Sequence, residues 1–236
     1  MKKILLYSGG SDSWLISKIW NPDVKVYIDM ETRYSKDELK KLDSDVKIIK
    51  FPLGKYERED AIIPLRNLYL PMVICNEFPE DDLDICLGAT AGDRVLDKSY
   101  IFADSASALL TYLYSPQHWI PKGRRIHINI DFKKYTKTEL LKMYLEKGGN
   151  IQEAFNCSFS CYNPENGKEC WQCKPCFRKF VSFALNGMRF KKEIVETVIS
   201  YIKKEILPSI QNGTYGRAQE EKEILNVLEL YENGKL

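Results

Sequence analysis

The sequence has little histidine, little net charge and no long apolar run. Its only histidines are His118 and His127, so a catalytic site built on histidine general bases is not expected. The 35 basic and 33 acidic side chains leave a net charge of +2, which gives no argument for binding to nucleic acid or to a membrane surface. No apolar stretch approaches the ~18 residues that span a bilayer, so no membrane partner is expected.

The two common phosphate-binding fingerprints, Gly-x-x-x-x-Gly-Lys-Ser/Thr and Gly-x-Gly-x-x-Gly, are also missing. In their place, an apolar run at residues 4–7 leads directly into Ser8-Gly9-Gly10-Ser11-Asp12-Ser13. The glycines let the backbone approach an anion, and a helix that starts near Ser13 would point its unpaired N–H groups at the same place. An acid such as Asp12 fits there only if a divalent cation bridges it to phosphate. The loop therefore predicts phosphate binding, and an ordinary tight turn is the alternative.

The first 150 residues alternate strand and helix patterns, which predicts an α/β fold with a doubly wound parallel sheet. The expected strands are Lys3–Tyr7, Lys25–Asp29, Val46–Phe51, Asp84–Gly88 and Arg125–Ile130. The expected helices are Ser13–Trp20, Ser35–Leu42, Leu65–Phe78, Ile101–Tyr114 and Thr136–Lys147. Capping boxes are expected at Ser35–Glu38 and Thr136–Glu139. In such a sheet, ligands bind beyond the carboxyl ends of the strands. The segments expected there are Ser8–Ser13, Asp29–Arg33, Gly88–Arg94 and Asp131–Lys137.

Gly148-Gly149-Asn150 ends the last of these helices and marks a boundary. We therefore expect an α/β domain over residues 1–150, a cysteine-rich module over 151–187 and a helical tail over 188–236. In the tail, the sequence predicts helices at Lys191–Ile206 and Ala218–Tyr231, separated by Pro208 and Gly213.

Seven cysteines are present, and four of them follow the spacing Cys-x8-Cys-x2-Cys-x2-Cys. These four are Cys161, Cys170, Cys173 and Cys176. The apolar stretch at the N-terminus is too short for a signal peptide, so we expect a cytoplasmic protein whose cysteines bind metal rather than form disulfides. Four thiolates suit a structural Zn²⁺ site. The final spacing also occurs in iron–sulfur proteins, and a redox-active or adventitious cluster is a further alternative.

The other three cysteines are assigned no metal. Cys75 lies in a helix pattern and Cys86 in a strand pattern, so both are expected to be buried by packing. Cys157 lies near the four-cysteine segment, and we leave it out of the ligand set.

The Ser8–Ser13 loop resembles the Ser-Gly-Gly-x-Asp-Ser loop of the ATP pyrophosphatase (PP-loop) superfamily. Together with the cysteines it resembles the 7-cyano-7-deazaguanine synthase family, which carries Ser-Cys-Tyr, a glycine and Cys-x2-Cys-x2-Cys-x2-Arg. The corresponding residues here are Ser160-Cys161-Tyr162, Gly167, Cys170, Cys173 and Cys176, with Arg178 in a near position. Further stretches that look like family signatures, in the same order, are Pro64-Leu65-Arg66-Asn67, Gly88–Asp93 and Thr136–Leu140.

The resemblance implies an adenine nucleotide alpha hydrolase-like, Rossmann-like fold and an enzyme that cleaves ATP to AMP and pyrophosphate. The implied substrates are 7-carboxy-7-deazaguanine and ammonia, the implied product is 7-cyano-7-deazaguanine of the queuosine pathway, and the implied cofactors are ATP, Mg²⁺ and Zn²⁺. The residues implied for ATP are Ser8, Gly9, Gly10, Ser11, Asp12, Ser13 and Asp29. Those implied for catalysis are Asp12, Ser13, Arg66 and Lys137, and those implied for the substrate are Arg33, Asp93 and Asp104. We also expect a homodimer and no nucleic-acid partner.

Several stretches depart from the family pattern. Residues 96–104 replace a Tyr-Pro-Asp-Cys-Arg stretch associated with the base substrate, Met30–Arg33 replaces a Tyr-Gly-containing loop, and a helical tail follows the cysteines in place of Asp-Pro. A tRNA-thiolating ATP pyrophosphatase and a non-catalytic zinc-ribbon protein that binds nucleic acid therefore stay open as alternatives. Single residues also have simpler alternatives: Lys137 as a solvated lysine, Arg66 in a surface ion pair, and Asp93 or Asp104 as helix caps.

Overall fold

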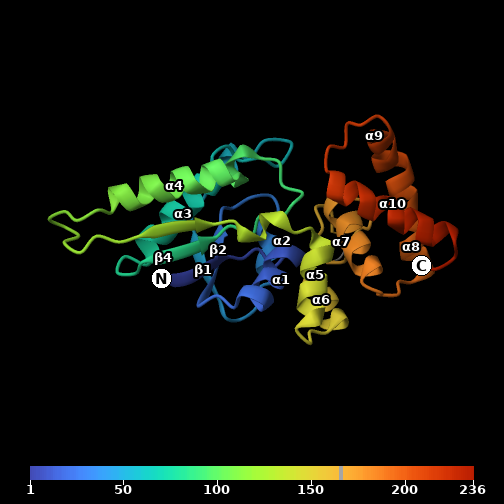
Figure 1. The fold of residues 1–236 in the computed structure, drawn as a ribbon, viewed down its shortest axis with the longest axis horizontal. Helices are drawn as coiled ribbons and strands as arrows, with labels where there is room; N and C mark the ends of the chain where they lie inside the picture. The colour runs from blue at the N-terminus through green and yellow to red at the C-terminus, as the bar shows by residue number, and fades with distance from the viewer. Residues whose placement is uncertain (165–166) are drawn as a thin grey trace. The chain divides into compact units, whose positions relative to one another are not determined.

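The computed structural model describes residues 1–164 and 167–236 and divides them into two compact units (Figure 1). The first unit comprises Met1–Gly9, Ile16–Ala89 and Asp93–Lys133, and the second comprises Gly10–Leu15, Thr90–Gly92 and Lys134–Leu236. The expected domain boundaries at residues 150 and 187 stay a prediction. Among the described residues, no helix combines the length and the apolar character needed to cross a membrane.

The first unit is built on a five-stranded sheet in which every neighbouring pair of strands is parallel. Its strands are β1 (Lys2–Leu6), β2 (Val24–Asp29), β3 (Val46–Lys50), β4 (Leu83–Cys86) and β5 (Ile126–Asn129). Their order in the sheet is β3-β2-β1-β4-β5, so the chain reverses its direction of travel between β1 and β4. The predicted doubly wound, Rossmann-like α/β fold is confirmed.

Helices cover both faces of this sheet, and the strand order determines which face each helix covers. They are α1 (Ser11–Trp20), α2 (Ser35–Leu39), α3 (Arg66–Glu77) and α4 (Tyr100–Leu113). Right-handed crossovers in this strand order put α1 and α2 on one face and α3 and α4 on the other. Accordingly, Ile74 of α3 and Leu110 of α4 share a buried core with Ile4 and Ile85 of the sheet, and Figure 1 shows both helices along the same side of the strands.

Short 3-10 turns connect these elements at Gly54–Tyr56, Leu96–Lys98 and Asp131–Lys134. The division between the two units runs through α1, whose first residues belong to the second unit. This helix begins at Ser11, two residues earlier than predicted.

The second unit is helical over most of its described length. Its helices are α5 (Lys137–Glu146), α6 (Ile151–Cys157), α7 (Lys174–Leu185), α8 (Lys192–Tyr201), a π-helical turn (Ile202–Ile206), α9 (Leu207–Gln211) and α10 (Ala218–Glu232). Phe177 and Phe180 of α7 form a core with Val198 of α8 and with Ile224 and Val227 of α10. The tail is therefore packed on α7, the helix that carries Cys176. The sequence patterns predicted neither α6 nor α7, and they distinguished this segment only by its cysteines.

The two predicted capping boxes have different outcomes. Thr136 and Glu139 form the predicted box at the start of α5, with both reciprocal hydrogen bonds present. The box at Ser35–Glu38 is wrong, because α2 starts at Ser35 itself and Tyr34 occupies the cap position. The Ser35 hydroxyl accepts from the Thr32 amide instead, and the Glu38 carboxylate accepts from the Tyr27 hydroxyl at 2.8 Å.

The predicted break at Pro208 is also wrong. Pro208 is the second residue of α9, directly after a π-helical turn. The π-helical turn before it carries the chain from α8 into α9, with the Leu207 amide donating to the Ile202 carbonyl. The chain leaves the helix further on, near Gly213, whose φ of 66° is left-handed.

Candidate functional site

The predicted phosphate loop joins β1 to α1. Gly9 has a φ of 72°, a left-handed conformation that a side chain would strain. The Trp14 amide and the Ser13 hydroxyl both donate to the Gly10 carbonyl, at 2.9 and 3.1 Å, which fixes the first turn of α1. Because the first amides of a helix have no partner within the helix, this turn can bind an anion. Ser8 is exposed, whereas Ser11 and Ser13 are buried.

Asp12 and Lys137 are brought together within the second unit. Asp12 lies in the first turn of α1, and Lys137 is the first residue of α5. The Lys137 ammonium donates to the Asp12 carboxylate, and both side chains keep partial access to solvent, at 19% and 24% exposure. An acid and a base beside helix N-H groups can together hold a metal-bound polyphosphate. The structure thus pairs two residues that lie 125 positions apart in the chain.

Asp29 and Arg33 follow β2 in the first unit. Asp29 is buried, and its carboxylate accepts from the Glu31 amide at 3.0 Å, which shapes the turn after the strand. The Arg33 guanidinium donates to the Glu57 carboxylate at 2.9 Å and to the Arg58 carbonyl at 2.7 Å. Arg33 therefore anchors the chain around Glu57, and its predicted contact with substrate stays a prediction.

Arg66 opens α3 in the same unit. It follows Leu65, whose φ of 60° is rare for a leucine, and such backbone strain concentrates at functional sites. The nearby Glu38 carboxyl has a raised pKa, chiefly because of burial, while the Tyr27 hydrogen bond and the positive charge of Arg66 act in the opposite direction. The neighbouring Asn67 amide donates to the Asp97 carboxylate at 3.3 Å, an acid that sequence reasoning did not single out.

Asp93 and Asp104 have different surroundings. The Asp93 carboxylate pairs with Lys98 at 3.1 Å, and the Asp93 carbonyl accepts from Lys133 at 2.8 Å. Asp104 lies on the exposed face of α4, and its carboxylate takes part in none of the hydrogen bonds or ion pairs found among the described residues. Asp93 is therefore held by two lysines, whereas Asp104 faces solvent. Their roles toward substrate stay predictions.

The four predicted metal ligands converge. The sulfur atoms of Cys161, Cys170, Cys173 and Cys176 all lie within 4.8 Å of one another. Four thiolates around one Zn²⁺, each about 2.3 Å from it, stand roughly 3.8 Å apart, so only small shifts would close the site. The four cysteines can therefore hold a metal ion.

Local backbone geometry prepares these sulfurs as ligands. The Cys170 amide donates to the Cys161 sulfur and the Gln172 amide to the Cys170 sulfur, both at 3.4 Å. A hydrogen bond from the Cys176 thiol lowers the pKa of Cys173 to about 5, so one thiolate forms readily within the cluster. Trp171 supports the turn between these cysteines with a φ of 58° and a ring stacked on Phe155.

Sequence reasoning missed a buried ion pair beside the cysteines. Lys179 is 1% exposed, and its ammonium donates to the Glu169 carboxylate and to the Phe155 and Ser158 carbonyls. Glu169 also accepts from the Ser160 amide at 2.8 Å. Lys179 thereby ties α7 to the segment that carries Cys161. Burial lowers the pKa of Lys179, while the charge of Glu169 opposes this effect.

Ser160 joins the metal segment to the phosphate loop within the second unit. Its hydroxyl lies 3.3 Å from the Ser11 hydroxyl and 3.4 Å from the Ser11 amide. Its carbonyl oxygen lies 3.1 Å from the Cys176 sulfur. Ser160 thus contacts the start of α1 on one side and a metal ligand on the other. Its position before Cys161 in the Ser-Cys-Tyr signature is the sequence signal that could have identified it.

The remaining cysteines behave as expected. Cys75 in α3 and Cys86 in β4 are both buried, and burial raises the pKa of Cys75 to about 11 and that of Cys86 to about 12. Both therefore stay protonated at neutral pH and are poor nucleophiles. Cys157, at the end of α6, is exposed and lies outside the four-sulfur group.

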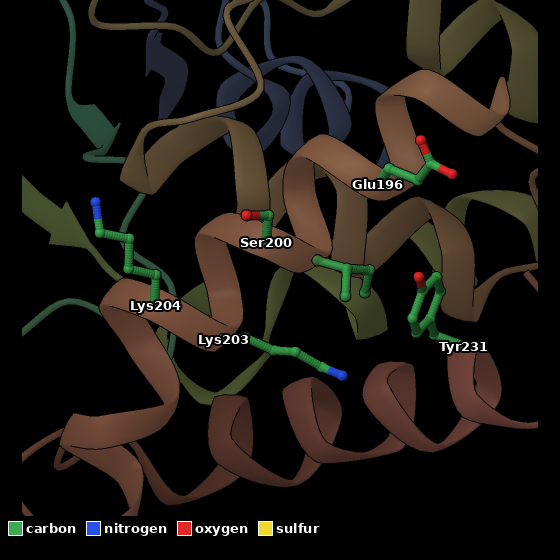
Figure 2. A pocket seen from close by; sticks show the side chains of 6 residues that line it. Glu196, Ser200, Lys203, Lys204 and Tyr231 are labelled. Carbon is green, nitrogen blue, oxygen red and sulfur yellow. The ribbon is translucent and has the colours of Figure 1, made fainter.

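A shallow cleft in the tail contains none of the predicted site residues (Figure 2). Its lining residues are Glu196, Ile199, Ser200, Lys203, Lys204 and Tyr231. Figure 2 shows the Lys203 side chain extending toward Tyr231, and its ammonium lies 5.5 Å from the centroid of the Tyr231 ring. The cleft is a feature of the tail surface and is separate from the phosphate loop in sequence.

Comparison with known proteins decides the family. The family model described as "Queuosine biosynthesis protein QueC" matches residues 54–187, which is more than half of the chain. The chain belongs to the QueC family. The QueC match contains the stretches at Pro64–Asn67, Gly88–Asp93 and Thr136–Leu140 and all four clustered cysteines. The phosphate loop and the helical tail over residues 188–236 lie outside it.

Individual relatives are more distant. The chain is 30% identical over 70 residues to proteins named 7-cyano-7-deazaguanine synthase from two strains of Leptospira interrogans, Fiocruz L1-130 and Lai 56601. Each alignment covers 30% of this chain and 27% of the relative, so the chain matches about a quarter of each relative's length. No solved structure matches the chain.

The buried ion pair generates a stability prediction. Lys179→Met keeps the length of the side chain but leaves the Glu169 carboxylate buried without its cation. We expect the free energy of unfolding, measured by urea denaturation, to fall by about 3–5 kcal/mol. Lys192→Met, at an exposed site on α8, is the control and should change it by less than about 0.5 kcal/mol. Equal stability of the two variants would contradict a structural role for Lys179.

Proposed function

We propose that this chain is an ATP-dependent carbon–nitrogen ligase that converts 7-carboxy-7-deazaguanine and ammonia to 7-cyano-7-deazaguanine. Membership of the QueC family and the printed name of its relatives support the substrate class. The observation that carries the proposal is the pairing of Asp12 and Lys137 at the phosphate-loop helix, next to the segment with four clustered sulfurs. We keep a cytoplasmic location as part of this proposal.

The chemistry requires an activated carboxylate, because a carboxylate in water does not react with amines. An oxygen of the substrate carboxylate attacks the α-phosphorus of ATP, and pyrophosphate leaves. Ammonia then attacks the acyl carbon, AMP leaves and a proton is lost, which gives the amide. The amide oxygen takes a second adenylyl group from ATP with release of pyrophosphate. Loss of AMP and of the remaining two amide protons gives the nitrile.

In this proposal the chain's own residues bind and neutralise the polyphosphate. The backbone of Gly9 and Gly10 and the hydroxyls of Ser11 and Ser13 bind the leaving pyrophosphate at the start of α1. Asp12 is the residue that would hold Mg²⁺, which supplies positive charge to the leaving group when bound. Lys137 stabilises the negative charge that develops as pyrophosphate departs. Arg66, Arg33, Asp29 and Asp93 keep their predicted roles toward ATP and the base.

Two alternatives have less support. A tRNA-thiolating enzyme of the same superfamily needs a reactive cysteine, and burial keeps Cys75 and Cys86 protonated. A zinc-ribbon protein that binds nucleic acid needs free cations. Lys137 and Lys179 are instead paired with Asp12 and Glu169, and Arg178 lies 3.2 Å from Glu220.

The reaction itself is testable with purified protein. With 7-carboxy-7-deazaguanine, ATP, Mg²⁺ and ammonium, we expect pyrophosphate and AMP, and a product lighter than the substrate by about 1 mass unit for the amide or about 19 for the nitrile. Asp12→Ala should lower pyrophosphate release at least ~100-fold while the protein stays folded, because it removes the proposed metal ligand. Asp104→Ala, at an exposed site, probes the substrate role separately. Release of ADP and orthophosphate would contradict the proposed class of enzyme.

We propose that the four cysteines hold Zn²⁺. A single ion needs all four sulfurs close together, and they lie within 4.8 Å of one another, whereas an iron–sulfur cluster distributes its four cysteines over two or four irons and needs wider spacing. Elemental analysis should give one zinc ion per chain, and Cys173→Ser should lower metal content and stability. Cys157→Ser, outside the group, is the matched control. Since Ser160 contacts Ser11, chelation should also weaken ATP binding. Iron with sulfide would contradict the zinc proposal.

The expected homodimer also stays a proposal, and α4 offers the surface that favours it. Ile101 is 80% and Tyr112 is 74% exposed, and Leu109 and Leu113 are half exposed on the same helix. Exposed apolar groups gathered on one helix are typical of an interface. We expect Tyr112→Glu to shift the chain toward monomer in sedimentation velocity, while Ile48→Glu on β3 leaves the distribution unchanged. A monomeric wild-type chain at all concentrations would contradict the dimer.

A further inference from the structure

A helix of the tail contacts two segments that carry family signatures. Helix α10 lies beyond residues 54–187, the part of the chain that the QueC model matches. Its Glu223 carboxylate accepts hydrogen bonds from Thr136 at 2.5 Å and from Thr138 at 2.7 Å. These two threonines flank Lys137 in the first turn of α5. The tail thus holds the turn that presents Lys137 to Asp12.

The bonding of Thr136 shows why this contact fixes the turn. The Thr136 hydroxyl has one proton to donate, and it donates this proton to Glu223. Its oxygen accepts from the Glu139 amide at 3.2 Å and so caps α5. The cap fixes the residue at which α5 begins, whereas the hydrogen bonds to Glu223 fix the position of the first turn of α5 relative to α10. Burial raises the pKa of the Glu223 carboxyl, and the two threonine hydrogen bonds oppose this effect.

The same helix closes over the Gly88–Asp93 signature at Gly92. A Cβ atom at Gly92 would lie 2.0 Å from the Glu220 carboxylate and 2.6 Å from the Arg217 guanidinium, so a side chain at this position would displace the ends of these two side chains. Glu220 is held by Arg217 at 3.1 Å, by the Tyr215 hydroxyl at 2.9 Å and by Arg178 at 3.2 Å. The start of α10 is therefore a fixed element of the second unit.

The apolar face of α10 gives Glu223 a rigid base. Ile224, Val227 and Leu228 are buried in a core shared with α7 and α8. Glu223 directly precedes Ile224 in the chain, so the backbone of Glu223 moves little once this core has formed. A carboxylate on a packed helix can hold a neighbouring turn more precisely than a side chain on a loop.

We propose that Glu223 is a positioning residue that sets the first turn of α5 through Thr136 and Thr138 and so keeps the Lys137 ammonium at the phosphate-loop helix. This inference rests on the proposed function, which gives Lys137 its role in catalysis. Lys137 has a long side chain, and its charge acts on the departing pyrophosphate only from a defined position. Displacement of a catalytic group by about 1 Å can cost about 100-fold in rate.

The kinetic test compares three variants of the full chain by pyrophosphate release. Glu223→Ala removes both acceptors, and we expect kcat to fall about 10- to 100-fold while KM for ATP changes less than about threefold. Glu223→Gln keeps an acceptor oxygen and should recover most of kcat. Glu229→Ala, at an exposed site on the same helix, should match the wild-type chain. Unchanged kcat in Glu223→Ala would overturn the inference.

A second measurement does not depend on activity. Reductive methylation with ¹³C-formaldehyde labels lysine amines without removing their charge, and Lys137→Arg identifies the Lys137 signal by its loss. We expect Glu223→Ala to shift this signal in NMR spectra and Glu229→Ala to leave it in place. A Lys137 signal that is the same in both variants would overturn the inference.

These readouts separate the two proposals. If the wild-type chain releases no pyrophosphate with 7-carboxy-7-deazaguanine, the proposed function fails and the Lys137 signal alone decides the coupling to Glu223. If the wild-type chain is active and Glu223→Ala behaves like it in both assays, only the coupling fails. Should Glu223→Ala not fold, Thr138→Val removes one of the two hydrogen bonds at nearly constant volume. It should then lower kcat and shift the same signal, and a wild-type result would overturn the inference.

Discussion

The buried ammonium of Lys179 constrains the position of the cysteine segment next to the first turn of α1. A lysine at 1% exposure is stable only if its charge and its donors are satisfied, and Glu169 and two backbone carbonyls do this. Glu169 in turn holds the Ser160 amide. Ser160 contacts both Ser11 and Cys176. One ion pair therefore couples the cysteine segment to the start of α1.

The first unit supplies a different constraint, which is the direction of its strands. Because all five strands are parallel, their carboxyl ends meet at one edge, and the order of the sheet reverses between β1 and β4. Asp29 and the phosphate loop follow β2 and β1 there, and the Gly88–Asp93 stretch follows β4. Family signatures far apart in sequence thus emerge from the same edge of one sheet. Among the stretches inside the family match, Gly88–Asp93 follows β4 in this way.

Much of the fold could be predicted from local patterns, while the contacts that set the site could not. The alternation of strand and helix patterns along the chain located all five strands. The capping box at Thr136 was predictable because it depends only on two residues three positions apart, Thr136 and Glu139. The box predicted at Ser35 failed because α2 starts at Ser35 itself, with Tyr34 at the cap position, and the Glu38 carboxylate accepts from Tyr27 on β2 instead. The four cysteines were found because metal ligands need a close spacing. Glu223 was missed because its partners lie 85 and 87 residues away.

The ion pairs of two lysines depend on contacts that local sequence patterns do not contain. Lys137 is paired with Asp12, and Lys179 is paired with Glu169. For Lys137, the pairing with Asp12 places an ammonium beside a carboxylate at the start of α1, an arrangement that fits the proposed role of Lys137 toward phosphate. The arrangement needs the first turns of α1 and α5 to stay in register. In this chain the glutamate that hydrogen-bonds to the second of those turns comes from a helix outside the family match, and for this reason the proposed function gives the tail a part in the site.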